Sequence, residues 1–71
     1  MKFEYDKSID ALYIRLIESP VHRTEEIEEG TNIDFAENGN FIGIEILNAR
    51  QRYSNKDLFT LSTESLALMD N

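Results

Sequence analysis

Cysteine is absent from this 71-residue chain, which has only one histidine, one proline and three glycines. Without cysteine, neither a disulfide nor a thiolate metal site can stabilise the fold. A single histidine cannot by itself supply a histidine-rich metal centre or complete a catalytic triad. The three glycines are widely separated, so they cannot form the usual phosphate-binding loop, and no serine lies in a nucleophile-elbow motif. These absences remove the most recognisable classes of enzyme site.

Basic residues are also scarce. The chain has 7 Lys and Arg against 14 Asp and Glu, which gives a formal net charge of −7. This balance argues against binding to nucleic acid or to an anionic membrane, because both require a basic surface. A basic protein is the better electrostatic match. A solvated acidic surface that binds nothing is the simpler alternative.

Long apolar segments are missing as well. No stretch approaches the roughly 18 residues of a membrane span. The N-terminal residues Met1–Asp6 lack the apolar centre of a signal peptide. We therefore expect a cytoplasmic protein, and the absence of cysteine fits a reducing compartment.

The length of the chain limits its hydrophobic core. Residues 1–71 are expected to form one domain, and a domain of this size buries only about 60% of its extended-chain surface. Without disulfides, it must depend on a compact, regular core or on self-association. We therefore expect a homodimer. Because the usual cofactor-binding motifs are missing, we expect no cofactor.

The N-terminal half shows the alternation of polar and apolar residues that is typical of half-buried strands. Lys2–Asp6 and Ala11–Ile17 alternate in this way, and the short link between them predicts a β-hairpin. Pro20 ends the second strand, since proline cannot donate to a sheet ladder. Val21–Ile27 is expected to be a charged edge strand; an exposed helix or a loose loop is the alternative.

The next segments predict two more strands and one or two helices. Thr31–Ala36 alternates, the dipeptide Asn38–Gly39 is a strong hairpin turn signal, and Phe41–Leu47 is the clearest strand in the chain. Asn48–Tyr53 contains good helix formers and no β-branched residue. A last helix is predicted over Glu64–Met69. The expected fold is α+β: an antiparallel β-meander of four to five strands with one or two short C-terminal helices packed on one face.

The alternation assigns ten side chains to one apolar face of the sheet. They are Phe3, Tyr5, Leu12, Ile14, Leu16, Ile33, Phe35, Ile42, Ile44 and Ile46. This face must be covered, because an antiparallel sheet buries one face against something. The C-terminal segment is the only cover that the chain offers, and a second chain could complete it. Phe41 and Gly43 are expected on the opposite face.

Two separated motifs resemble a known family. The first is Tyr5–Asp6 followed by Asp10–Leu16, and the second is Gly43–Ala49, with Asn32–Phe35 and the Asn38–Gly39 turn between them. Together they are similar to the Domain of Unknown Function family 2283 of small bacterial and archaeal proteins. The resemblance covers about residues 3–50. It implies no established activity and no catalytic residues. Some members resemble antitoxins that are encoded beside ribonuclease-like toxins, which implies a basic protein partner.

The opposite, polar face carries the candidate binding residues. These are Glu4, Tyr13, Arg15, Asp34 and Glu45. Two carboxylates near a tyrosine and an arginine could perform acid–base chemistry or hold a hard cation. The simpler interpretation is a solvated face with cross-strand ion pairs, each contributing about 0.2–1 kcal/mol. Gly43 leaves room beside Glu45, which a partner could use for close packing.

Two weaker features lie in the expected edge strand. His22 could join Glu25 and Glu26 in a weak divalent-metal cluster, although an exposed strand residue is the commoner role for a lone histidine. The acidic run at residues 25–29 could steer a basic partner toward the protein. It could equally be a solvated strand edge.

Three functional hypotheses follow from the sequence. The first is a noncatalytic protein-interaction module, antitoxin-like, which binds a basic ribonuclease-like partner. The second is a small metal-dependent or acid–base enzyme that works from Glu45, Asp34 and Tyr13. The third is a structural homodimer with no further activity, whose polar face is the seam. The sequence favours the first and assigns no catalytic or metal-ligating residue.

Overall fold

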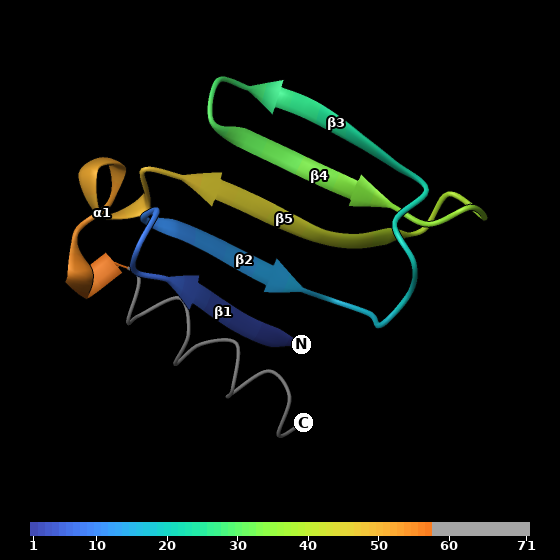
Figure 1. Cartoon of the computed structure of the whole chain (residues 1–71), viewed down its shortest axis with the longest axis horizontal. Coiled ribbons are helices and arrows are strands. Elements are labelled where there is room, and N and C mark those ends of the chain that lie inside the picture. Colours follow the sequence, from blue (N-terminus) through green and yellow to red (C-terminus); the bar gives the residue numbers. More distant parts are fainter. Residues whose placement is uncertain (58–71) are drawn as a thin grey trace.

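The computed structural model of this chain describes residues 1–57, which form a five-stranded antiparallel sheet with a short helix at one end (Figure 1). Residues 55–57 are also helical. The elements are β1 Lys2–Asp6, β2 Ala11–Arg15, β3 Arg23–Glu28, β4 Thr31–Phe35, β5 Phe41–Leu47 and α1 Ala49–Arg52. The predicted α+β class and antiparallel strands are confirmed. The helix predicted over residues 64–69 lies outside the described residues.

The strands lie in the order β1-β2-β5-β4-β3. A hairpin of β1 and β2 therefore pairs with a three-strand meander of β3, β4 and β5, through contact between β2 and β5 (Figure 1). The central strand β5 is hydrogen-bonded on both sides, and its sequence is apolar except for Glu45. Every residue of β3 is exposed, which confirms the predicted edge strand.

Local side-chain bonds fix two of the three hairpin turns. The Asp6 carboxylate accepts hydrogen bonds from the backbone nitrogen and the hydroxyl of Ser8, at 2.9 and 2.6 Å. At the other end of the sheet, Asn38 Oδ1 accepts from the Asn40 backbone nitrogen at 3.0 Å. Gly39 has φ +89°, a conformation that glycine adopts without steric cost. The Asn-Gly signal thus marks the true turn between β4 and β5.

Helix α1 joins two turns at one end of the sheet. Its Ala49 backbone nitrogen donates to the Asp10 carbonyl at 3.0 Å, and the Ala49 side chain is fully buried. Arg52 reaches the β3–β4 turn, where it donates to the Gly30 carbonyl at 3.1 Å and to Glu28 at 2.8 Å. The helix predicted over Asn48–Tyr53 is present in shorter form. No helix among residues 1–57 is long and apolar enough to cross a membrane.

The ten predicted apolar residues occupy one face in the observed register, but their burial is uneven. Leu12, Phe35 and Ile42 are buried, and five others are half-buried. Tyr5 and Leu16 are exposed at 41% and 47%, so their assignment to the core is wrong. Tyr5 lies on the edge strand β1 and donates its hydroxyl to Asp10 at 2.7 Å, while Leu16 lies just beyond β2.

A register shift changes the position of Phe41. The pairing of β4 with β5 slips between Asp34 and Phe35, so that Phe35 faces Phe41. Their ring centroids are 5.1 Å apart in an edge-to-face arrangement. Phe41 therefore lies on the apolar side with Phe35, because directly opposed residues share a face. The expectation that Phe41 joins the polar face is wrong, since one extra residue reverses the alternation.

Candidate polar binding face

The register brings the five predicted binding residues together on one face of the sheet. Tyr13 lies between Glu4 on β1 and Glu45 on β5, directly opposite each. One pleat further along, Arg15 pairs with Gly43, and Gly43 pairs with Asp34 on β4. Four strands therefore contribute side chains that the sequence separates by up to 41 positions.

Tyr13 bridges strands that are not neighbours. Its hydroxyl donates to Asp34 Oδ2 at 2.7 Å, crossing β5 at Gly43. A β-carbon at position 43 would lie 2.7 Å from the tyrosine ring, so the ring fills the space expected to be open there. The Thr24 hydroxyl donates to the other oxygen, Oδ1, of Asp34. Both carboxylate oxygens of Asp34 are thus engaged within the sheet.

Arg15 extends these contacts to the other edge. Its guanidinium lies 4.9 Å from the centroid of the Tyr13 ring, within the range of a cation–π interaction. Its Nε donates to Glu4 Oε1 at 3.4 Å. This hydrogen bond lowers the pKa of Glu4, and in return it raises the pKa of Arg15.

These contacts form a continuous polar belt, which we define as Glu4, Arg15, Tyr13, Asp34 and Thr24. The belt runs from edge strand β1 to edge strand β3. Glu45 lies beside it and accepts a hydrogen bond from Asn32 Nδ2 at 3.3 Å. Thr24 and Asn32 were missed by the sequence analysis. Their alternation places them on the polar side of their own strands, but only the register shows what they contact.

The geometry bears directly on acid–base chemistry. Burial, followed by the hydrogen bond to Asp34, raises the pKa of Tyr13 from 10.0 to about 12. The phenol is therefore protonated at neutral pH and cannot act as a general base there.

Within residues 1–57, no group of three or more His, Cys, Asp or Glu side chains is placed to hold a metal ion. Glu25, assigned to a possible metal cluster with His22, instead forms an ion pair with Arg23 at 3.4 Å.

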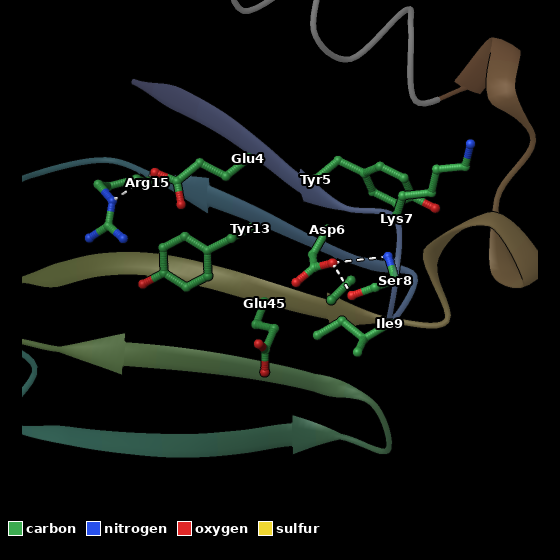
Figure 2. A pocket seen from close by; sticks show the side chains of 10 residues that line it. Glu4, Tyr5, Asp6, Lys7, Ser8, Ile9, Tyr13, Arg15 and Glu45 are labelled. Atoms are coloured by element: carbon green, nitrogen blue, oxygen red, sulfur yellow. Dashed lines mark hydrogen bonds and ion pairs between the residues drawn. The ribbon is translucent and has the colours of Figure 1, made fainter.

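A shallow hollow of about 600 Å³ opens on the polar face beside the β1–β2 turn (Figure 2). Asp6 and Glu45 lie at the turn end together with Ile9, while Glu4 and Arg15 lie at the other end. The Tyr13 ring lies between them (Figure 2). Carboxylates around an aromatic ring suit a cationic side chain better than an anion.

Comparison with known proteins gives one match. A family model described as a protein of unknown function, DUF2283, matches residues 2–50, from the start of β1 into α1. No curated protein and no solved structure matches the chain.

Proposed function

This chain belongs to DUF2283, a family of proteins of unknown function, and we propose that it is a noncatalytic protein-interaction module whose polar face binds a basic protein. One observation carries the proposal. The register gathers five carboxylates on the polar face, from Glu4, Asp6, Glu26, Asp34 and Glu45, against two cations, Lys2 and Arg15. The difference is a net charge of −3 on one face of the sheet.

The polar belt supports this proposal because it holds its side chains in place before binding. Tyr13 is fixed by Gly43 beneath it and by Asp34 at its hydroxyl. Arg15 is fixed by Glu4. A surface that is ordered before binding loses less side-chain entropy when the partner docks. A binding role therefore uses the belt as it stands, without breaking its internal bonds.

A ribonuclease-like toxin is the basic partner that we propose. A protein that binds RNA must present cations to the phosphates, and an acidic module that covers those cations would block the substrate. The chain would then act as an antitoxin in the cytoplasm. The absence of cysteine fits that compartment.

The enzyme hypothesis has less support. It requires Tyr13, Asp34 and Glu45 to act on a substrate, yet Asp34 is engaged through both oxygens and Tyr13 donates its only hydroxyl proton to it. Glu45 is bonded to Asn32. Each of these groups would have to give up an internal bond before it could react.

Affinity capture from native cells tests the proposal, with the full chain as bait and the bound proteins identified by mass spectrometry. We expect a basic protein whose capture weakens as salt increases. Glu45→Gln should reduce capture several-fold. Glu37→Gln is the matched control, because it removes the same charge from an exposed residue outside the polar face. Recovery of the bait alone across growth conditions, or equal capture by both variants, would contradict the proposal.

A further inference from the structure

The apolar face of the sheet remains partly open to solvent. Phe3, Ile14, Ile33, Ile44 and Ile46 are only half-buried. At the margins of this face, Tyr5 and Phe41 are exposed at 41% and 57%. These two rings alone leave roughly 200 Å² of aromatic surface in water, if a full side chain contributes about 200 Å². Exposed apolar surface on one face of a sheet is a candidate interaction surface.

The charges on the apolar face cancel. The register places Arg23, Glu25 and Glu28 on this side of β3, and Arg52 reaches it from α1. Arg23 pairs with Glu25 at 3.4 Å, and Arg52 pairs with Glu28 at 2.8 Å. Strands β1, β2, β4 and β5 contribute no charged side chain to this face. It is therefore neutral, although the chain as a whole carries −7.

We infer that the apolar face is covered by a second copy of this chain, with the two sheets packed face to face. An acidic protein is repelled by its own copy wherever two acidic surfaces meet, so a neutral face is where two copies can approach. A basic partner would gain nothing electrostatically from that face. The acidic polar face therefore suits a basic partner, and the neutral apolar face suits a second copy of this chain.

The dimensions of the sheet suit such a pair. Five strands of about five residues give a face of roughly 24 by 17 Å. Side chains that project from the face add to this area, as do the rings of Tyr5 and Phe41 at its margins. The total area approaches the lower end of specific interfaces, about 600 Å² per partner. Two sheets packed in this way lie about 10 Å apart, as in a β-sandwich.

The dimer would leave both polar belts facing outward. Each belt lies on the side of its sheet opposite Ile14 and Ile44, away from the seam. The dimer would therefore present two equivalent acidic faces. This inference stands independently of the proposed function, because it concerns the other side of the sheet. The third hypothesis from the sequence placed the seam of a homodimer on the polar face. The present inference places the seam on the apolar face instead.

Sedimentation equilibrium of the full chain across dilution tests the inference. We expect a species of twice the 8.2 kDa chain mass that dissociates as the concentration falls. Ile44→Lys places a charge at the centre of the apolar face and should weaken association at least tenfold. Ile9→Lys is the matched control, because Ile9 is 60% exposed and lies at the hollow on the polar face, away from the proposed seam. It should leave association unchanged.

A cross-linking experiment keeps the inference testable if Ile44→Lys does not fold. The chain has no cysteine, so one introduced thiol is unique. Ile33 and Asn32 are adjacent in β4 and point to opposite faces. Ile33→Cys should cross-link as a dimer with a short bismaleimide, and Asn32→Cys should not. Equal cross-linking of both variants would overturn the inference. So would a monomer at every concentration, which would leave residues 58–71 or another protein as the cover.

Discussion

The ring of Tyr13 occupies the space that a side chain at position 43 would need. A β-carbon on Gly43 would lie 2.7 Å from the ring and 2.7 Å from the Ile14 carbonyl oxygen. Real β-carbons essentially never approach heavy atoms so closely, so either the ring or the strand would have to move. Glycine at position 43 is therefore what allows Tyr13 to reach across β5 to Asp34.

Gly43→Ala is expected to destabilise the fold. Extra volume in a well-packed site costs about 1–3 kcal/mol, and the free energy of unfolding in urea measures this cost. The same substitution in a Tyr13→Ala background should cost less, because the contact with the ring is gone while that with the Ile14 carbonyl remains. An equal cost in both backgrounds would show that the ring is not the reason for glycine.

The ionisation of Tyr13 should appear at unusually high pH. Its pKa is raised to about 12 in the folded protein from an ordinary 10.0. A raised pKa stabilises the fold fully below the unfolded value, near 10, and this contribution disappears as the pH rises through about 12. Ultraviolet titration of tyrosinate should show one group ionising near 12. Tyr13→Phe should remove that group, and if the late step persists, it belongs to another residue.

Asp10 should make the stability of the fold depend on pH in the acidic range. Its hydrogen bond from Tyr5 is the main reason that its pKa is lowered from 3.8. A lowered pKa contributes stability above the unfolded value, and this contribution is lost as the pH falls through the lower folded value. Asp10→Asn removes the charge but tolerates the observed φ of 52°, because asparagine adopts the left-handed conformation readily.

The measurement is the urea midpoint from pH 7 down to pH 2. We expect Asp10→Asn to be less stable than the parent at pH 7, and the difference to shrink below about pH 4, where the parent carboxylate takes up its proton. Glu37→Gln serves as the control because Glu37 is exposed on the β4–β5 turn. A constant difference between Asp10→Asn and the parent across the range would exclude titration of Asp10 as the cause.

Much of the fold could be read from the sequence, since it depends on local patterns. The alternation of Lys2–Asp6 and Phe41–Leu47 reflects the two-residue period of a strand, and Asn38–Gly39 supplies its own turn geometry. The same alternation placed Glu4, Tyr13, Arg15, Asp34 and Glu45 on one face. One error arose at the edge of the sheet, where Tyr5 follows the alternation of β1 but is 41% exposed, and another arose where this period is interrupted. The irregularity beside Phe35 moved Phe41 to the other side, and no signal in the sequence marked it.

The sequence by itself determined the strands, the main turn, the two faces and the acidic charge, because each arises from neighbouring residues or from composition. Only the tertiary structure decided which strands pair, because β5 inserts between β2 and β4. That pairing placed Gly43 under Tyr13 and brought Asp34 and Thr24 to the phenol. Contacts between residues far apart in the chain depend on register, and register is fixed only when the whole sheet has formed.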